Sequence, residues 1–330
     1  MGPKQIVSAL HTLISIKQPV FLWGAPGVGK SQVVARVARD LGLALRDIRA
    51  VLLDPVDLRG LPRISSSGTA VWCPPSFLPA EGDEKRGILF LDELNTAPPL
   101  VQAACYQLIL DRVIGEYHLP DGWTIVAAGN RERDRSVTHR MPTALANRMV
   151  HLDFDALLDD WLDWARESGI RAEVRAFLRF RPKFLHNLEP DLAEKAFPSP
   201  RSWEFVSRIL DAGPESDVAY ELFRGTVGKA AAAEFAGFMD VWQQLPDVDE
   251  VLANPGSARV PEEPAAMYAL SSALGLAADE DNMDAIALYA MRIQPEFGVL
   301  VMREAVACNP CLVRTRAFAR WAEDNAEVLL

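Results

Sequence analysis

The sequence has few cysteines, and they exclude a zinc framework. Only four occur among 330 residues, and just one C-x-x-C pair, Cys308 and Cys311, is present. We interpret all four as reduced, partly buried thiols of a cytosolic protein. Half of a metal site or a redox pair remains the alternative for Cys308 and Cys311.

Basic residues and long apolar runs are also scarce. Lys and Arg number 34 against 45 Asp and Glu, which gives a net charge of −11. Because phosphate backbones are bound by clustered cations, this balance argues against a broad nucleic-acid or membrane footprint, although a local basic strip is compatible with it. No run approaches the roughly 18 apolar residues of a membrane span, and residues 1–17 lack the apolar centre of a signal peptide. The sequence predicts a soluble, cytoplasmic protein without a membrane partner.

A glycine-rich segment is the most specific feature that is present. The apolar run Pro19–Trp23 precedes it and the helical pattern Gln32–Leu41 follows it, as G-x-x-x-x-G-K-[ST] requires. The predicted phosphate-binding residues are Gly24, Ala25, Pro26, Gly27, Val28, Gly29, Lys30 and Ser31. Backbone N–H groups of such a loop, and the positive end of the helix after it, bind phosphates. Lys30 is expected to reach the β- and γ-phosphates and Ser31 to supply a hydroxyl to Mg²⁺; a chance glycine turn would do neither.

A second apolar run, Gly87–Leu91, is typical of a strand buried on both faces, and it ends in Asp92 and Glu93. In α/β sheets the carboxyl ends of strands are where ligands bind. Asp92 is predicted to organise the Mg²⁺ shell with Ser31, and Glu93 to orient or deprotonate the attacking water. A solvated acidic turn is the alternative, but the phosphate loop upstream favours the catalytic interpretation.

Polar residues follow two further predicted strands. Trp123–Ala128 is apolar and leads to Asn130, whose amide is predicted to hydrogen-bond the γ-phosphate or the water; satisfying a turn is the alternative. Arg148 precedes the strand Met149–Phe154, away from its own phosphate loop. We predict that it reaches a neighbouring subunit's site, because a guanidinium is always charged and forks onto phosphate oxygens. Arg140 is a second candidate for such a contact.

After Asp155 only helical patterns follow. Arg201 opens the pattern Arg201–Leu210, in a first turn where the helix dipole disfavours a cation. This placement predicts a contact with nucleotide phosphate, with a snorkelling surface arginine as the alternative. The other predicted helices are Leu157–Glu167, Glu173–Arg179, Leu192–Lys195, Val218–Phe223, Lys229–Trp242, Ala265–Leu274, Met283–Met291, Phe297–Ala307 and Val313–Leu329.

The motifs resemble those of the AAA+ ATPases, and within them the MoxR-like, dynein-related group. Gly24–Ser31 resembles Walker A, Ile88–Glu93 resembles Walker B and Asn130 resembles sensor 1. Arg148 resembles the arginine finger and Arg201 resembles sensor 2. Five motifs in the expected order make the resemblance specific for the superfamily.

The resemblance covers roughly residues 1–212 and implies an α/β fold. Residues 1–155 would form a P-loop NTPase αβα sandwich with a five-stranded parallel sheet, and residues 156–212 an all-α lid carrying Arg201. Residues 213–330 would be a C-terminal helical region of unknown role. In the MoxR-like group the finger is usually followed by Phe rather than by Met149, a conservative departure.

The resemblance also implies a function. ATP and Mg²⁺ would bind between the subunits of a homo-oligomeric ring, usually a hexamer, that acts as a chaperone-like motor on a protein client with a von Willebrand factor A-domain partner. A hairpin predicted at Ile64–Trp72 looks like the insert in helix 2 of this clade, and we interpret it as a partner or pore loop, with a purely structural hairpin as the alternative. The alternative functions are a nucleotide-gated assembly module with little hydrolysis and a nucleic-acid-associated motor subunit.

Overall fold

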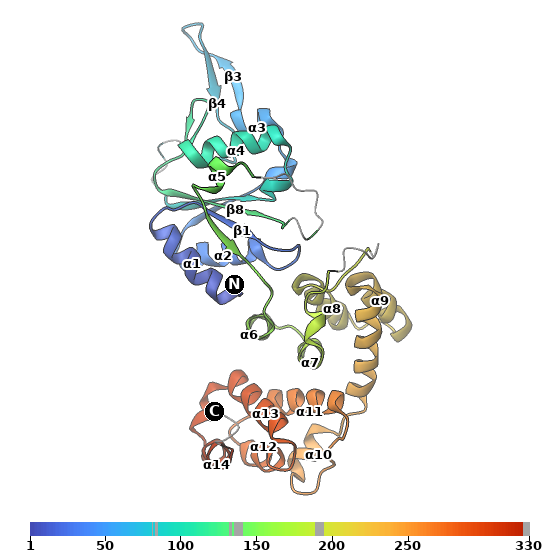
Figure 1. Ribbon diagram of the computed structural model, residues 1–330. Coiled ribbons are helices and arrows are strands. Elements are labelled where there is room, and N and C mark those ends of the chain that lie inside the picture. Colours follow the sequence, from blue (N-terminus) through green and yellow to red (C-terminus); the bar gives the residue numbers. More distant parts are fainter. Residues whose placement is uncertain (81, 83–84, 132–133, 135–140, 189–194, 326–330) are drawn as a thin grey trace. The chain divides into compact units, whose positions relative to one another are not determined.

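The computed structural model describes residues 1–80, 82, 85–131, 134, 141–188 and 195–325 (Figure 1). These residues group into two compact units. The first is built on Met1–Asp160 and the second on the described residues from Trp161 onward. The three-part division at residues 155 and 212 stays a prediction.

The first unit is organised around a parallel sheet of five strands in the order β2-β5-β8-β1-β9, which confirms the predicted α/β class. The strands are β1 Val20–Trp23, β2 Ala44–Arg49, β5 Gly87–Asp92, β8 Trp123–Gly129 and β9 Val150–Asp153. Because β5, β8 and β1 are neighbours and parallel, their carboxyl ends at Asp92, Gly129 and Trp23 meet at one edge. Sequence segments about a hundred residues apart thereby reach a common ligand-binding position.

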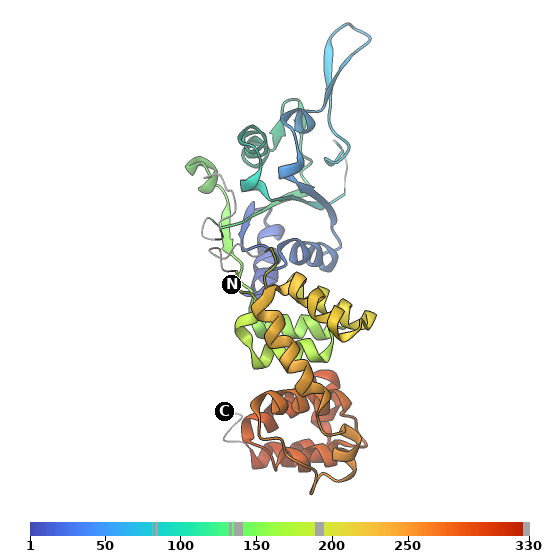
Figure 2. The same ribbon diagram turned by 90° about the vertical axis from the view of Figure 1, so that its right-hand side faces the viewer.

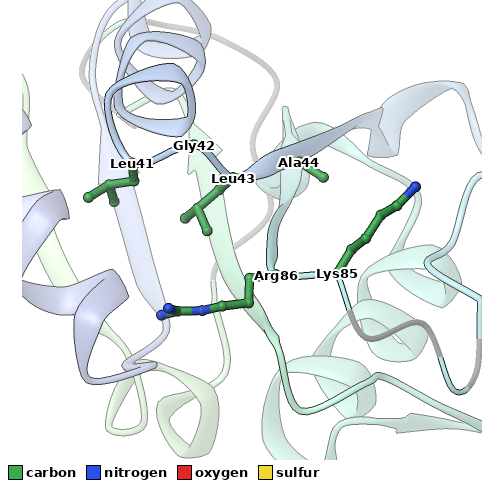
Figure 3. A pocket seen from close by; sticks show the side chains of 6 residues that line it. All are labelled: Leu41, Gly42, Leu43, Ala44, Lys85 and Arg86. Atoms are coloured by element: carbon green, nitrogen blue, oxygen red, sulfur yellow. The ribbon is translucent and has the colours of Figure 1, made fainter.

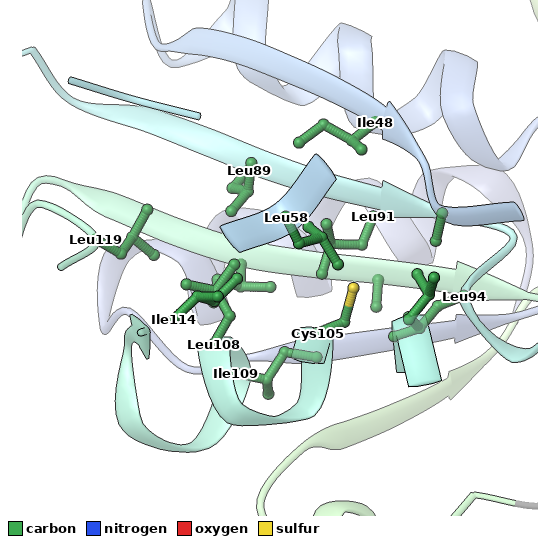
Figure 4. Packing of buried hydrophobic residues seen from close by; sticks show 14 of the residues in the cluster. Ile48, Leu58, Leu89, Leu91, Leu94, Cys105, Leu108, Ile109, Ile114 and Leu119 are labelled. Carbon is green, nitrogen blue, oxygen red and sulfur yellow. The ribbon is translucent and has the colours of Figure 1, made fainter. Parts of the chain in front are cut away.

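Helices cover both faces of this sheet. They are α1 Pro3–Ser15, α2 Lys30–Asp40, α3 Pro55–Arg59, α4 Pro99–Asp111 and α5 Thr143–Ala146. Successive strand residues point to opposite faces, so Ile88 and Phe90 pack in the core formed with α1 and α2, while Leu89 and Leu91 pack in the core formed with α3 and α4 (Figure 4). The continuous apolar sequence of β5 is explained by burial on both sides.

The predicted hairpin is present and extends away from the sheet (Figures 1 and 2). It pairs β3 Leu61–Ile64 with β4 Ala70–Cys73, so it is longer than the predicted segment. All residues of both strands are exposed. A smaller hairpin, β6 Val113–Ile114 with β7 Tyr117–His118, was not predicted; its turn residue Glu116 accepts a hydrogen bond from the Trp72 backbone N–H at 3.2 Å.

From Leu158 onward the regular structure of the described residues is helical. The α-helices are α6 Leu158–Glu167, α7 Ala172–Phe180, α8 Pro200–Ala212, α9 Ser216–Gln243, α10 Val248–Ala253, α11 Pro264–Ala277, α12 Met283–Ala290, α13 Pro295–Cys308 and α14 Arg316–Asp324. None of the described helices is long and apolar enough to cross a membrane.

The two helices predicted at 218–223 and 229–242 are confirmed as separate segments, because α9 is interrupted between them at Gly228 with φ 81° and ψ 167°, a conformation that requires glycine. Two other helix predictions have a different outcome. The predicted helix Val313–Leu329 is instead a 3-10 turn, Pro310–Arg314, followed by α14, because Thr315 caps a new helix by accepting from the Phe318 N–H. Of the predicted helix Leu192–Lys195, only Lys195 lies within the described residues.

An aromatic cluster joins α7, α8 and α9. Phe177 lies within 5.6 Å, between ring centroids, of Trp203, Phe235 and Phe238. The Trp203 indole N–H donates to the Phe184 carbonyl at 2.6 Å, so the polar edge of this buried ring is satisfied. The predicted helix Arg201–Leu210 therefore packs into the second unit through Trp203.

A buried carboxylate with three arginines joins α6, α7 and α13. Glu304 is 2% exposed and pairs with Arg179, with Arg166 at 3.2 Å and with Arg175 at 3.7 Å. Burial alone raises the pKa of Glu304, but the hydrogen bond from Arg179 and the three positive charges outweigh it and hold the pKa below its ordinary value. The carboxylate is therefore charged in the folded protein and compensates cations from two other helices.

Replacing Glu304 with glutamine is expected to destabilise the second unit by about 3–5 kcal/mol, because removal of one partner leaves buried charges uncompensated. Since the folded pKa is depressed, this contribution is full above the unfolded value of about 4.3 and is lost as pH falls through the folded value. Urea unfolding at pH 7 and pH 3.5 measures both effects. Glu204→Gln, which breaks an exposed pair with Arg208, is the matched control and should cost under about 1 kcal/mol; equal losses in the two variants contradict the assignment.

Candidate nucleotide-binding site

The glycine loop between β1 and α2 has the backbone that its sequence predicts. Gly27 and Gly29 have φ values of 81° and 100°, which side chains disfavour, and α2 begins directly after Gly29. At Gly24 a Cβ atom would lie 2.9 Å from the Phe154 carbonyl oxygen. The loop therefore depends on glycine at several positions, and the N-terminus of α2 lies at its end, where an anion is favoured.

The Lys30 side chain is buried and folds over the loop. Its ammonium group donates to the carbonyl of Gly24 at 2.7 Å and to the carbonyl of Ala25 at 3.2 Å. It also donates to Asn130 Oδ1 at 3.1 Å. Two predicted site residues, one at the start of α2 and one directly after β8, are thus brought into direct contact, although 100 residues separate them.

The Ser31 hydroxyl and the Asp92 carboxylate form the second link between predicted site residues. Ser31 Oγ donates to Asp92 Oδ2 at 2.7 Å, and the Glu93 backbone N–H donates to Asp92 Oδ1 at 2.9 Å. Hydroxyl and carboxylate oxygens are the ligands that Mg²⁺ prefers, and Mg²⁺ usually takes only one or two carboxylates together with phosphates and waters. No cluster of three or more His, Cys, Asp or Glu able to hold a metal occurs among the described residues. The pair therefore fits Mg²⁺ bound jointly with a nucleotide.

The carboxyl group of Asp47 interacts electrostatically with that of Asp92. Burial raises the pKa of Asp47 on the neighbouring strand β2, and the charge of Asp92 raises it further, against the opposing effect of Arg49. The charge of Asp92 therefore reaches a carboxyl group on the adjacent strand.

Glu93 directly follows β5 and is exposed at the tip of the strand. Its φ of 56° is uncommon for a residue with a side chain. The turn is closed by Thr96, whose backbone N–H and hydroxyl both donate to the Glu93 carbonyl, at 3.1 and 2.8 Å. The strand end is therefore bent so that Asp92 stays buried while Glu93 faces outward, an arrangement that keeps the predicted Mg²⁺ ligand apart from the predicted water-activating residue.

Arg148 lies exposed on the turn between α5 and β9. The turn is held from two sides, because Gln18 Nε2 donates to the Arg148 carbonyl at 3.2 Å and His151 Nε2 contacts the Ala146 carbonyl at 2.9 Å. His151 Nδ1 in turn accepts from the Trp23 indole N–H at 2.9 Å. The backbone of this turn is thus fixed while no described residue bonds the guanidinium.

Comparison with known proteins identifies this part of the chain. Residues 19–149, from β1 to the turn before β9, match the family model described as the AAA domain of the dynein-related subfamily. This segment is an AAA domain. The chain is 26% identical over 199 residues to Protein MoxR of Paracoccus denitrificans, an alignment that covers 59% of this chain and 54% of that protein. The predicted AAA+ ATPase class, with MoxR-like relatives, is confirmed.

Other similar proteins are known at comparable or lower identity. The RuvB subunit of the Holliday junction branch migration complex from Lacticaseibacillus casei is 24% identical over 213 residues, covering 58% of each chain. The crystal structure of NtrX from Brucella abortus in complex with ADP is 15% identical, covers 98% of this chain and 68% of that one, and has a TM-score of 0.42. The chain spans about half the length of the MoxR proteins that it matches, 54% and 51%.

Two predicted residues lie outside the AAA domain site as described. Arg201 is exposed in the first turn of α8, as predicted, and that helix begins with a capping box of Ser199 and Ser202. It belongs to the second unit, so its contact with phosphate stays a prediction. Arg140 lies outside the described residues.

A surface pocket of the AAA domain lies away from these residues (Figure 3). It is found where β2 and β5 begin, and it is lined by Leu41, Gly42, Leu43, Ala44, Lys85 and Arg86. Ligands of α/β sheets bind at the opposite, carboxyl ends of the strands. The pocket is therefore separate from the edge that carries Asp92 and Asn130.

Two polar residues near the site were missed by the sequence analysis. Asn95 hydrogen-bonds the backbone of Asn130, and Arg131 donates to the Phe154 carbonyl at 3.0 Å and to Asp155 at 2.7 Å. The sequence analysis assigns Arg131 no role, yet its side chain is 11% exposed and ties β8 to the end of β9. The available signal was position, since Asn95 and Arg131 follow the ends of the predicted strands Gly87–Leu91 and Trp123–Ala128 by four and three residues.

Proposed function

We propose that the AAA domain binds ATP with Mg²⁺ at Gly24–Ser31 and hydrolyses the bond between its β- and γ-phosphates. The observation that carries the proposal is the pair of contacts from Lys30 to Asn130 and from Ser31 to Asp92, which joins the first turn of α2 to the ends of the neighbouring strands β8 and β5. A chance glycine turn or a solvated acidic turn would not need these contacts. The same four side chains carry the chemistry that ATP hydrolysis requires.

Each residue has a role in the proposed reaction. The loop N–H groups and Lys30 would hold the phosphates, and Ser31 and Asp92 would hold Mg²⁺, which would supply positive charge to the phosphate oxygens when bound. Glu93 orients or deprotonates the attacking water, and Asn130 orients that water or the γ-phosphate. Arg148 of a neighbouring subunit stabilises the charge that develops in the transition state, and Arg201 links the lid to the nucleotide state.

The assembly and its use are the finer part of the proposal. A homo-oligomeric ring, a hexamer by resemblance, brings Arg148 of one copy to the nucleotide of the next. The similarity to MoxR proteins supports a chaperone-like motor that remodels a protein client together with a von Willebrand factor A-domain partner. The exposed hairpin β3–β4, whose Leu61 and Ile64 are 68% and 78% exposed, is the proposed contact for client or partner.

Two other functions are tested against this one. The similarity to a RuvB subunit favours a nucleic-acid-associated motor as the second candidate, against which the net charge of −11 counts. A nucleotide-gated assembly module would not need both Glu93 and Arg148. Steady-state ATPase assays, alone and with duplex DNA at low salt, separate the three: turnover without DNA supports the motor on proteins, stimulation by DNA supports the second candidate, and binding without turnover supports the assembly module.

Replacing Lys30 with alanine is expected to weaken ATP binding by roughly 2–5 kcal/mol, because a buried cation that pairs with phosphate is removed. Calorimetric titration with ATP and Mg²⁺ measures the loss. Lys229→Ala removes an exposed lysine of α9 and should bind as the wild type does. Affinity for ATP equal to that of the wild type in the Lys30 variant would mean that the nucleotide binds elsewhere.

The mass of the particle, measured with and without ATP, tests whether the protein forms a ring.

A further inference from the structure

Asn95 makes an unusual pair of contacts beside the proposed site. It lies in the 3-10 turn Leu94–Thr96 after Glu93, and it is 2% exposed. Its Nδ2 donates to the Asn130 carbonyl at 2.7 Å, and its Oδ1 accepts from the Asn130 backbone N–H at 3.2 Å. One amide therefore binds both polar groups of a single residue, which fixes the position and the orientation of that residue's backbone.

The end of β8 is shaped to admit this amide. Gly129 is the last residue of β8, and a Cβ atom there would lie 2.1 Å from Asn95 Oδ1. Any side chain at Gly129 would displace Asn95. Glycine at position 129, directly before Asn130, thus leaves the space that the Asn95 amide occupies.

The turn that carries Asn95 is itself held by α4. Gln102 is 3% exposed, and its Nε2 donates to the Ala97 carbonyl at 2.8 Å and to the Asn95 carbonyl at 3.4 Å. The Tyr106 hydroxyl donates to Gln102 Oε1. Burial, and the nearby Cys105, raise the pKa of Tyr106 to about 12, so the hydroxyl keeps its proton. Buried polar groups supported in this way hold one conformation.

We propose that Asn95 is the positioning residue that sets the distance between Asn130 and the γ-phosphate, so that hydrolysis depends on it and nucleotide binding does not. The inference rests on the proposed ATPase function. Asn130 Oδ1 lies 3.1 Å from Lys30 Nζ, and Asn95 stands two residues after Glu93 on the same turn. Asn95 therefore couples the position of the water-activating carboxylate to that of the amide on the next strand. The phosphate loop itself does not contact Asn95 through any described hydrogen bond.

The test compares Asn95→Leu and Asn95→Ala with wild type. Leucine has the shape of asparagine and removes both hydrogen bonds, whereas alanine leaves room for water to pair with both groups of Asn130, which preserves the fold if leucine does not. We expect kcat to fall about 10- to 100-fold in each, with the affinity for ATP changed by less than about threefold. The Asn130 amide hydrogen should exchange faster in both variants.

Thr124→Val is the control for stability alone. Thr124 is a buried polar residue of the same strand, and its hydroxyl donates to the Ile14 carbonyl at 3.5 Å, at the end of the strand away from the site. Its kcat should stay at the wild-type value even if its melting temperature falls. If kcat of the Asn95 variants stays within about twofold of wild type, or if affinity falls instead of kcat, the inference is overturned while the ATPase function stands. A wild type that binds ATP without turnover overturns both.

Discussion

Replacing Arg148 with alanine is expected to lower the rate of ATP hydrolysis by roughly 10³- to 10⁵-fold, as the loss of an arginine finger does in characterised systems. The side chain is exposed, and no described residue bonds its guanidinium, so its removal should leave the stability of the AAA domain nearly unchanged. The turn around it is fixed through Gln18 and His151, so the rest of the turn should stay in place. Steady-state turnover at saturating ATP measures the loss.

Arg36→Ala is the matched control, because Arg36 is an exposed arginine of α2 that pairs only weakly with Asp40 at 3.8 Å. Mixing two inactive proteins then asks whether Arg148 acts between subunits. In a mixture of Arg148→Ala and Glu93→Gln, about a quarter of the contacts between copies in a head-to-tail ring combine an intact Glu93 with an intact Arg148. Turnover should reappear on mixing. A mixture as inactive as its components rules out the intersubunit role.

Glu93→Gln is expected to bind ATP as the wild type does and to hydrolyse it roughly 10²- to 10⁴-fold more slowly, because the amide cannot accept a proton from water. The substitution keeps the size of the side chain at a position with φ of 56°, and it leaves Asp92, Ser31 and Lys30 untouched. Single-turnover assays with bound ATP separate the chemical step from binding.

Glu167→Gln, at an exposed position of α6, controls for the loss of one negative charge. It should turn over ATP at the wild-type rate. Near-normal turnover in Glu93→Gln would show that Glu93 does not activate the attacking water. Asp92 or Asn130 would then be the candidates for that role. Loss of nucleotide binding would instead mean that Glu93 contributes to the phosphate site.

The site residues that could be predicted from the sequence are those that a local sequence pattern marks. Gly27 and Gly29 are needed for positive φ, and the buried strand before Asp92 is recognisable from its apolar run. The strand and loop order is enough to bring Lys30 and Asp92 to one edge of a parallel sheet. Which of the predicted residues come together is thus determined by the order of the strands in the sheet rather than by any property of the individual side chains.

The missed features depend on contacts between distant segments. Asn95 meets Asn130 across 35 residues, and Glu304 meets Arg179 across 125, so neither pairing leaves a local pattern. Arg131 resembles any exposed charge in sequence, and only the end of β9 makes it a structural residue.

The cluster around Glu304 also bears on how the chain can be shortened. A protein ending at residue 212 would retain Arg166, Arg175 and Arg179 but would lack the carboxylate that neutralises them. In such a fragment the three arginines would be either exposed to solvent or buried without a counter-charge, and the fragment should aggregate or unfold. The helices on either side of residue 212 are therefore expected to be inherited together. A chimera that exchanges the C-terminal helices between relatives should fold only if it contains both the carboxylate and the arginines that pair with it.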